Sequence, residues 1–419
     1  MRLAVFTNQF PGPTCTFFAR DMRGLIEAGI DIDVFPIYPL DPTLWRYVPN
    51  ILNEKVLPRR RVHHINPAEL LYHLTSLPFK KLRTFLCDTA AIACSAVKHG
   101  VEPLAKNIYA MAKGLALAET LSGEYDHVLA YWGNYTATCA YIFHRLTAPQ
   151  IPFSIFLHAS IDLYKDTGCT QENLLYADKI ITCSNFNREF IGTKFQDIWS
   201  SLAEKIHVHD HGLDLRQCSF EPNSRPARKI SAVGRFAKQK GFDYLLRAVH
   251  ELKRRGMNLD VELVGDGEEA QSLRSLAQEL GIMQSVRFRG WLPADEVPPA
   301  IRQATLLVHP SPDLGDGVPN VIKEAMALGT PVVASSIAGI PEILDDGRCG
   351  FVVPPKDVKA LADAIETMLA NDSLRATYAN AARKRVEEKY NLWQNGQRLA
   401  AILRATERHD VGSRKAVSG

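Results

Sequence analysis

The chain has 419 residues, of which 46% are hydrophobic and 23% are charged. Single hydrophobic cores stop growing at roughly 250–300 residues, so we expect two or three domains, and this ordinary composition excludes collagen, a coiled coil and wholesale disorder. The 49 basic residues exceed the 46 acidic ones by a net charge of only +3, which gives no general reason to expect nucleic acid as a partner.

The N-terminus and the cysteines point to a cytoplasmic protein. The first apolar run is short and ends in a Phe-Pro-Gly-Pro turn, so it predicts a β-strand and not a signal peptide. No stretch approaches the roughly 20 uncharged apolar residues of a membrane-spanning helix; the best, 85–97, contains Asp88. The cysteines form no CxxC pair and no zinc-site spacing, so we expect reduced thiols. They are Cys15, Cys87, Cys94, Cys139, Cys169, Cys183, Cys218 and Cys349.

The first half of the chain alternates apolar strand patterns with helical ones. A strand at 2–8 is followed by a helix at 15–28 and a strand at 30–38. After a long interruption, further strands are predicted at 127–133, 152–158, 179–184 and 205–212. This alternation indicates a Rossmann-like domain with a parallel sheet.

The interruption, 56–117, is basic, with nine Lys or Arg residues against three acidic ones and a net charge of +6. Leucines between 70 and 77 lie at helical spacing beside Lys80, Lys81 and Arg83. Such a pattern suits a helix on an anionic membrane surface. The alternative is a solvated helix face packed on the first domain, and the pattern does not decide between the two.

The second half repeats the alternation more regularly and predicts a parallel doubly wound sheet. Its strands are predicted at 229–234, 259–265, 285–288, 305–311, 330–335 and 350–353, and its helices at 242–255, 268–280, 294–303, 320–328, 340–344 and 357–369. Residues 221–228 hold two prolines without apolar periodicity and are the predicted linker. We therefore expect an N-terminal domain at 1–222, a C-terminal domain at 228–388 and a helix within 392–419.

Ligands of open α/β sheets bind beyond the carboxyl ends of the strands, so the loops there are the first place to seek a site. The loop Gly234-Arg235-Phe236-Ala237-Lys238-Gln239-Lys240-Gly241 leads from a strand into a helix. Backbone N–H groups at a helix start, with the cations Arg235 and Lys240, would make a diphosphate site. The alternative is a basic loop whose charges simply face solvent.

A second loop carries two acids, Asp316 and Glu324, eight residues apart. It follows a strand ending at Ser311, and Pro319 suits the first turn of the helix that comes next. Carboxylates accept hydrogen bonds from neighbouring hydroxyls, so these acids suit sugars and riboses. Together with the basic loop, they point to a nucleotide-sugar.

These motifs resemble glycosyltransferase family 4, group 1 enzymes of the GT-B fold, in which an acid, seven residues and a glutamate precede Ala-Met-Ala and a strand of small residues. The segments 330–335, 338–343 and 350–353 continue the family pattern in order, so the resemblance covers about 120 residues from Gly234 to Val353. The resemblance implies an α/β protein with two Rossmann-like doubly wound lobes that face each other across a cleft. The usual first acid is Glu, whereas this chain has Asp316.

The resemblance assigns a role to each residue of the second half that matches the family motif. Arg235 and Lys240 would neutralise the donor diphosphate and its charge on departure. Glu324 would bind the ribose hydroxyls. Asp316 would bind hydroxyls of the donor sugar, near the backbone N–H groups of Gly317 and Val318. The nucleobase would lie between the segments Gly265-Asp266-Gly267 and Gly290-Trp291-Leu292.

The first half matches less closely. His158 resembles the strand-end histidine that points toward the donor sugar, the alternative being a histidine hydrogen-bonded in the core. Gly12, in the loop after the first strand, would approach the diphosphate, although many relatives have two glycines there. Ser184 and the segment 211–214 also match family positions; for Ser184 we favour a helix cap.

The implied activity is a retaining transfer of a sugar from a nucleotide-diphosphate donor to an acceptor hydroxyl, without metal or other cofactor. Front-face attack with the departing phosphate as base fits the family, while double displacement would need a carboxylate nucleophile, and none is evident. The acceptor would be a glycan or lipid-linked glycan in exopolysaccharide synthesis. The N-terminal domain would bind it at the cytoplasmic face of the plasma membrane, in part through 56–117.

Two other functions fit the same fold. A nucleotide-sugar 2-epimerase would need no acceptor, and the basic insertion argues mildly against it. A degenerate binding subunit is suggested by Asp316 and the reduced first loop, while the retention of Arg235, Lys240 and Glu324 argues against it.

Three further sequence patterns are weaker evidence for a function. Asp31 and Asp33 match a DxD metal motif but lie in an alternating strand pattern. Gly265-x-Gly267 lacks the third glycine of a dinucleotide fingerprint. His63 and His64 have no partners at ligand spacing.

Overall fold

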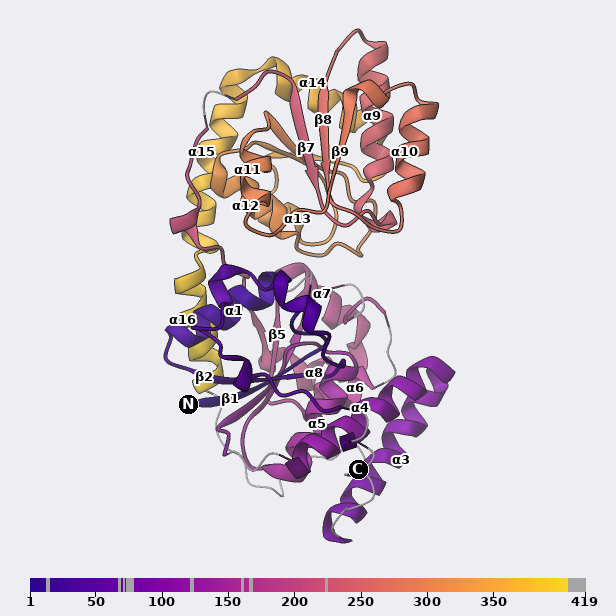
Figure 1. Ribbon diagram of the computed structural model, residues 1–419, viewed down its shortest axis with the longest axis vertical. Helices are drawn as coiled ribbons and strands as arrows, with labels where there is room; N and C mark the ends of the chain where they lie inside the picture. Colours follow the sequence, from indigo (N-terminus) through magenta and orange to yellow (C-terminus); the bar gives the residue numbers. More distant parts are fainter. Residues whose placement is uncertain are drawn as a thin grey trace. The chain divides into compact units, whose positions relative to one another are not determined.

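The computed structural model describes residues 1–12, 16–66, 69–70, 72, 79–120, 124–159, 162–165, 169–222 and 225–405, with the backbone alone described for 79–84. The chain divides into two compact units (Figure 1). Unit 1 comprises Met1–Asp210 and Trp393–Gly419, and unit 2 comprises His211–Leu392.

Unit 1 is built on a six-stranded parallel sheet with the strand order β2-β1-β3-β4-β5-β6. The strands are β1 (Arg2–Thr7), β2 (Asp31–Pro36), β3 (His127–Ala130), β4 (Phe153–Leu157), β5 (Lys179–Thr182) and β6 (Ile206–Val208). Every residue of β3 and β4 is buried, because helices cover both faces of a parallel sheet. The strand order reverses between β1 and β3, which makes the loops after these strands a natural ligand position.

Two of the described α-helices of unit 1, α5 and α7, begin with a side-chain cap. They are α1 (Thr16–Glu27), α3 (Phe79–Ala96), α4 (Val101–Thr120), α5 (Tyr135–Thr147), α6 (Thr170–Tyr176), α7 (Asn185–Lys194) and α8 (Trp199–Leu202). Short 3-10 helices lie at Pro42–Tyr47, Asn50–Leu52, Arg59–Arg61, Val97–His99, Gln196–Ile198 and Ala203–Lys205. Ser184 accepts a hydrogen bond from the Asn187 N–H at 3.1 Å, so its predicted role as the cap of α7 is confirmed.

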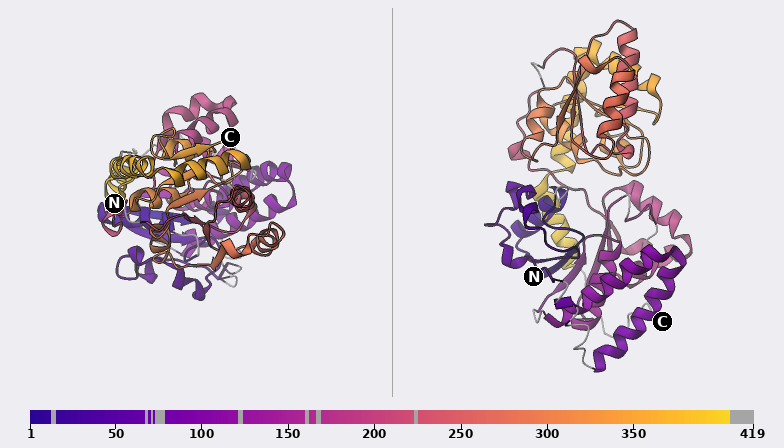
Figure 2. Two further views of the ribbon diagram at one scale, coloured as in Figure 1. Left: turned by 90° about the horizontal axis from the view of Figure 1, so that it is seen from above. Right: turned by 45° about the vertical axis from the view of Figure 1, so that its right-hand side comes forward.

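The predicted insertion contains α3 and α4, the purple pair on the flank of unit 1 in Figure 2. Gly114 of α4 approaches α5 so closely that a Cβ there would lie 2.4 Å from the Cys139 carbonyl oxygen. The buried face of α4, which includes Ala110 and Leu115, thus packs on the unit. Among the described residues, no helix is both long and apolar enough to cross a bilayer.

Residues 393–404 of the last helix, α16 (Leu392–Arg404), pack on unit 1. The Leu403 carbonyl lies 3.1 Å from His127 Nδ1, and Arg404 Nη2 donates to the Ala28 carbonyl at 2.6 Å. Gly396 is essential for this approach, since a Cβ there would lie 2.6 Å from the Gly24 backbone. The C-terminal helix is therefore a structural part of the N-terminal unit.

Unit 2 is a second six-stranded parallel sheet, with the order β12-β11-β10-β7-β8-β9. Its strands are β7 (Lys229–Val233), β8 (Asp260–Val264), β9 (Val286–Gly290), β10 (Leu306–His309), β11 (Val332–Ser335) and β12 (Phe351–Val353). Its helices are α9 (Phe242–Arg254), α10 (Ala270–Glu279), α11 (Val297–Arg302), α12 (Asn320–Leu328), α13 (Ile340–Ile343), α14 (Val358–Ala370) and α15 (Asp372–Lys389). The 3-10 helices are Leu215–Gln217, Lys238–Lys240 and Met283–Ser285.

Two hydrophobic cores cover the two faces of this sheet. Side chains of α9, α10 and α14 form one, with Leu246, Leu273 and Ile365 among its members. Side chains of α11, α12, α13 and α15 form the other, with Ile322 and Val386 among its members. The predicted fold class is confirmed: each unit is a doubly wound parallel α/β unit.

The boundary between the units lies at Asp210 and His211, before the linker predicted at 221–228. Residues after it bond within unit 2: the Leu213 N–H donates to the Tyr390 carbonyl at 2.7 Å. Arg225 donates to the Leu328 carbonyl at 3.0 Å. These contacts attach the segment ahead of β7 to the second sheet.

Candidate functional site

The loops after β7 and β8 of unit 2 are in direct backbone contact. The Phe236 N–H donates to the Asp266 carbonyl at 2.9 Å, and the Gly234 N–H donates to the Val264 carbonyl at 2.9 Å. A Cβ on Gly265 would lie 1.9 Å from the Gly234 oxygen. With φ at +142°, Gly265 also has a backbone conformation that L side chains rarely adopt. The predicted glycines thus bring two loop backbones into direct contact.

Lys240 and Asp316 join the loops after β7 and β10. Lys240 ends the 3-10 helix Lys238–Lys240, and its Nζ lies 2.6 Å from Asp316 Oδ1. Gly241, in the left-handed region at φ 64°, lets the chain enter α9 beside Pro310. The structure therefore brings together one predicted diphosphate-binding cation and the predicted sugar-binding acid.

The other oxygen of Asp316 has partners that the sequence did not predict. Its Oδ2 lies 2.6 Å from His309 Nε2 and accepts a hydrogen bond from Ser311 Oγ at 2.7 Å. All three residues are buried. Burial alone would raise the pKa of Asp316, but Lys240 and His309 outweigh it and hold that pKa well below its ordinary value. Asp316 is thus an anion, suited to accept hydrogen bonds and not to donate a proton.

Arg235 behaves differently from Lys240. Its guanidinium is exposed and lies 3.6 Å from Glu268, an equally exposed carboxylate. An ion pair between exposed groups contributes little to stability, so it leaves Arg235 available to a ligand. Among the predicted cations, Lys240 is the one held by a buried acid.

The remaining predicted residues lie on neighbouring loops of the same sheet. The Gly265 N–H donates to the Gly290 carbonyl at 2.9 Å, which places Trp291 and Leu292 beside the loop after β8, and Trp291 is 44% exposed. The carbonyl of Gly317, next to Val318, accepts the Gly339 N–H at 3.0 Å.

Glu324 and Asp266 complete the predicted donor-binding set. Glu324 lies on α12 and is half-buried, and Asp266 is exposed in the loop after β8. All the predicted residues of unit 2 therefore lie on loops at the carboxyl ends of its strands or on the helix that follows.

A cavity of about 490 Å³ lies next to these loops. Lys238, Asp313 and Arg247 contribute to its lining, whereas Lys240 and Asp316 are not among the described residues that line it. This cavity is therefore adjacent to the predicted donor site and not identical with it.

In unit 1, His158 follows β4 and is enclosed by aromatic rings. Its ring centroid lies 4.3 Å from that of Phe156, in a stacked arrangement, and 4.8 Å from that of Tyr131. Trp132 and Phe17 complete the enclosure, at 4.6 and 5.2 Å. This packing orients the imidazole firmly, and its 6% exposed surface matches a strand-end position in the protein interior.

His158 also has a carboxylate neighbour. Its Nδ1 lies 3.5 Å from Asp162 Oδ2, and Asp162 is fully buried. Burial raises the pKa of Asp162, although His158 opposes that rise. The carboxylate therefore lies on the Nδ1 side of the imidazole.

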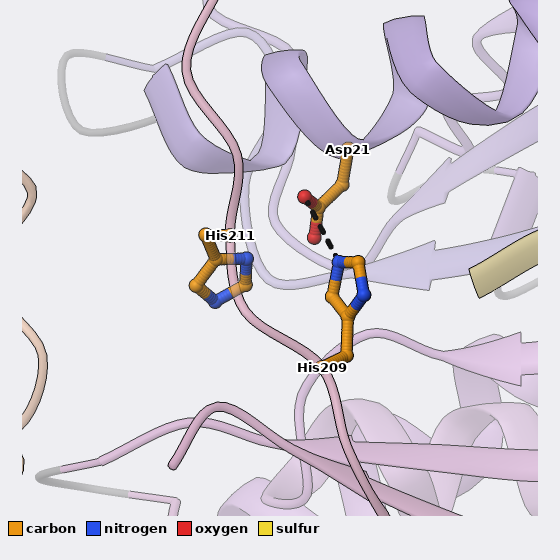
Figure 3. Close-up of side chains that lie close together, drawn as sticks. All are labelled: Asp21, His209 and His211. Atoms are coloured by element: carbon orange, nitrogen blue, oxygen red, sulfur yellow. Dashed lines mark hydrogen bonds and ion pairs between the residues drawn. The ribbon is translucent and has the colours of Figure 1, made fainter. Parts of the chain in front are cut away.

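A set of hydrogen-bonded residues next to this enclosure was not predicted from the sequence. The Tyr131 hydroxyl donates to Asp21 Oδ2 at 2.6 Å. Asp21 Oδ1 lies 3.4 Å from His209 Nε2 (Figure 3). His209 packs edge-on against Phe156, which stacks on His158. Burial, then Asp21, raises the pKa of Tyr131 well above its ordinary value, so its hydroxyl remains a donor.

Gly12 lies at the end of the described loop after β1. A Cβ there would meet the side chain of Gln9 at 3.6 Å, an ordinary contact. The structure thus gives no steric requirement for glycine at this position, and its predicted approach to a diphosphate stays a prediction.

The interpretation of Asp31-x-Asp33 as part of a strand is confirmed. Asp33 is buried, and its carboxylate contacts Arg2, Arg61 and His63. Burial would raise its pKa, but these partners, His63 first, lower it. His63 therefore has a structural partner, and the carboxylate that a metal would need is already engaged.

Residues 227–371 match the sequence family described as Glycosyl transferases group 1. This match, together with two doubly wound units that align with GT-B structures, confirms the relationship that the motifs predicted: residues 227–371 form a group 1 glycosyltransferase domain in a chain with the GT-B fold.

Two curated relatives come from bacterial polysaccharide synthesis. The putative colanic acid biosynthesis glycosyltransferase WcaL of Escherichia coli (strain K12) is 30% identical over 235 residues, which cover 52% of this chain and 58% of WcaL. The amylovoran biosynthesis glycosyltransferase AmsK of Erwinia amylovora is 23% identical over 429 residues, covering 96% of this chain and 99% of AmsK. The chain spans about half the length of the first curated relatives it matches, between 44% and 62%.

Solved structures agree with the fold over nearly the whole chain. A sucrose-phosphate synthase from Thermosynechococcus elongatus has a TM-score of 0.71 and 19% identity, with 96% of this chain and 98% of that chain covered. HepE from Anabaena, in complex with UDP, has a TM-score of 0.68 and 19% identity, with 96% and 99% covered. At these identities, the likeness shows the fold.

Proposed function

We propose that the protein is a glycosyltransferase that moves a sugar from a nucleoside-diphosphate donor to an acceptor hydroxyl in the synthesis of a polysaccharide or lipid-linked glycan. The observation that carries this proposal is the contact of Lys240 with Asp316 at the carboxyl ends of β7 and β10. Lys240 can bind a phosphate and Asp316 can bind hydroxyls, and the two side chains touch. Such a pair suits a molecule that joins a diphosphate to a sugar. HepE, which has the same fold, was solved with UDP, and this supports a nucleotide-sugar donor.

The donor would lie along the carboxyl ends of the unit 2 sheet. Lys240 and exposed Arg235 would bind the diphosphate, Glu324 the ribose and Asp316 the sugar. In the reaction, the bond between the anomeric carbon and the phosphate oxygen breaks, and a bond from the acceptor oxygen to the same carbon forms. The two cations stabilise the charge that grows on the diphosphate, so the proposed reaction needs no metal ion.

The proposed transfer retains the anomeric configuration, with the acceptor hydroxyl giving its proton to the departing phosphate oxygen. In this proposal Asp316 acts only as a hydrogen-bond acceptor for hydroxyls, because its Lys240 and His309 neighbours keep it an anion. The role of His158 as a hydrogen-bonding group for the donor sugar is proposed from the family resemblance.

The polysaccharide assignment follows the relatives WcaL and AmsK, whose names place them in colanic acid and amylovoran biosynthesis. A lipid-linked acceptor would be reached at the cytoplasmic face of the plasma membrane. The exposed turn between α3 and α4 supports this proposal, since Val97 and Val101 are 56% and 84% exposed beside Lys98.

A donor-hydrolysis screen tests the proposal. Purified protein is incubated with UDP-, GDP- and ADP-sugars, with and without EDTA, and nucleotide release is followed. We expect release from one donor, unchanged by EDTA and reduced by about 100-fold or more in Lys240→Ala, the scale of one lost transition-state contact.

Glu324→Ala should also reduce release, through the ribose. Lys238→Ala is the matched control, because Lys238 belongs to the same 3-10 helix but is exposed and lines the neighbouring cavity. Release of an epimerised free nucleotide-sugar, or no turnover with any donor in the presence of lipid-linked acceptors, would refute the proposed transfer.

A further inference from the structure

The two oxygens of the Asp316 carboxylate have different kinds of partner. Oδ1 lies 2.6 Å from Lys240 Nζ. Oδ2 lies 2.6 Å from His309 Nε2 and accepts from Ser311 Oγ at 2.7 Å. Because an ionised carboxylate only accepts hydrogen bonds, His309 Nε2 must carry its proton and donate it. The carboxylate is therefore held from two sides.

The partners on the Oδ2 side are fixed by the sheet. His309 is the last residue of β10 and pairs with Ala334 of β11, and its side chain is only 3% exposed. Ser311 follows two residues later and is fully buried. Both side chains are short or planar, so they can hold the carboxylate with little loss of conformational entropy.

Lys240 is the more exposed partner and the one with the longer, more flexible side chain. Its side chain is 18% exposed and extends from a 3-10 turn through a flexible four-carbon stem. If the proposed function holds, a donor diphosphate competes with Asp316 for this ammonium. The carboxylate would then lose its closest cation while it is still needed for the donor sugar.

We propose that His309 is a positioning residue: with Ser311, it holds the Asp316 carboxylate in place for the donor sugar while Lys240 turns to the diphosphate. This inference rests on the proposed function. Withdrawal of Lys240 leaves Oδ1 open to a sugar hydroxyl, and the His309 and Ser311 bonds keep that oxygen pointing in a fixed direction. Diphosphate binding and sugar binding are thereby linked through one ion pair.

The predicted signature separates the sugar from the nucleotide. His309 and Ser311 act through Asp316, which would contact the sugar, so their loss should weaken the nucleotide-sugar and spare the free nucleoside diphosphate. General damage to the loops would weaken both ligands alike.

The experiment compares His309→Leu, which removes the N–H donor, with His309→Gln, whose amide nitrogen can replace it. Dissociation constants are measured by calorimetry for UDP-glucose, GDP-mannose and ADP-glucose and for free UDP, GDP and ADP. For the nucleotide that binds the natural protein, we expect His309→Leu to weaken nucleotide-sugar binding by about tenfold, the scale of a hydrogen bond to a charged group. Free diphosphate affinity should change less than about twofold on the same scale.

His309→Gln should recover most of the loss, and Ser311→Ala should show a smaller loss of the same kind. His250→Leu is the matched control, because His250 lies on α9 and bonds to the Leu280 carbonyl. If His309→Leu loses no affinity, or loses equal affinity for the nucleotide-sugar and the free diphosphate, the inference is overturned while the proposed function stands. Failure of the natural protein to bind any of these ligands overturns the proposed function and this inference with it.

Discussion

The ammonium of Lys113 donates a hydrogen bond to the carbonyl oxygen of Ile37 at 2.8 Å, and the lysine is 1% exposed. This contact ties α4 to the end of β2. One of the nine basic residues of 56–117 is thus an interior group of unit 1.

The first prediction concerns the titration of Lys113. Burial lowers its pKa, so between that lowered pKa and the ordinary value near 10.5 the unfolded chain binds more protons than the folded one. Stability from this group therefore rises with pH across that window. The unfolding free energy of the natural protein, minus that of Lys113→Met, should increase as pH rises from 7 to 10. Denaturant titrations at several pH values measure it, and a pH-independent difference would contradict the prediction.

The second prediction separates Asp33 from Asp31. Asp33→Asn removes a buried carboxylate that faces three partly exposed cationic or imidazole partners, so we expect a loss of about 2 kcal/mol after allowing for solvent screening. Asp31→Asn, in which the native carboxylate is 55% exposed, should cost less than about 0.5 kcal/mol.

The two variants should also differ in how their unfolding free energy depends on pH. The pKa of Asp33 is lowered in the folded protein, so its contribution is present above the unfolded value near 3.8 and is lost as pH falls toward the folded pKa. The unfolding free energy of the natural protein should therefore fall steeply below about pH 4, and Asp33→Asn should lack this dependence. Asp33→Asn should still unfold at a higher pH than Asp31→Asn, because its overall stability is lower. Equal destabilisation by both variants would count against a structural role confined to Asp33.

The third prediction tests the contact between the loops after β7 and β8. Gly265→Ala would place a Cβ 1.9 Å from the Gly234 oxygen, so we expect a loss above about 2 kcal/mol and weaker donor binding. Gly256→Ala is the matched control: it too has a positive φ, 81°, but nothing lies within 4 Å of its Cβ. It should cost about 1 kcal/mol, the backbone penalty alone. Similar thermal unfolding of the two variants would show that the loops can separate without cost.

The alternation of strands and helices was sufficient to predict both sheets, because each parallel strand is buried on two faces and appears as an apolar run. It did not predict α15, whose 18 residues include many charges and whose buried residues are Ala379, Ala382 and Val386. A helix whose buried residues are two alanines and a valine leaves little apolar periodicity in the sequence.

The candidate site was predicted through residue types that carry obvious chemistry, such as Lys240 and Asp316. His309 and Ser311 were not predicted as site residues, because a histidine and a serine at the end of a strand are common in many contexts. In the strand predicted at 305–311 their spacing of two puts them on one face, directly before the loop with Asp316, and that pattern was the available signal. The strand itself ends at His309.

The burial of Lys113 was not predicted either. It lies three residues from Ala110 and one from Gly114, which share the buried face of α4. A net charge summed over a segment does not show which helix face each charged residue occupies. By contrast, the contacts of Asp21 join α1 to residues more than 100 positions away, and no local pattern contains them.

The last prediction concerns the turn between α3 and α4. Of the basic residues in 56–117, Arg61 pairs with Asp31 and Asp33, and Lys113 is buried, so fewer charges reach the surface than the sequence count suggests. Membrane contact, if it occurs, should therefore depend on the exposed apolar residues Val97 and Val101 more than on net charge.

We expect Val97→Asp combined with Val101→Asp to lower co-sedimentation with vesicles of one-third phosphatidylglycerol by about tenfold, since two apolar side chains leave the bilayer and two anions approach it. Met283→Asp, at an exposed apolar site of unit 2, serves as control and should bind as the natural protein does. Raising the salt concentration should weaken binding only in part, because the apolar contribution is not screened. Binding that is abolished by salt and unaffected by the double substitution would place the contact elsewhere on the chain.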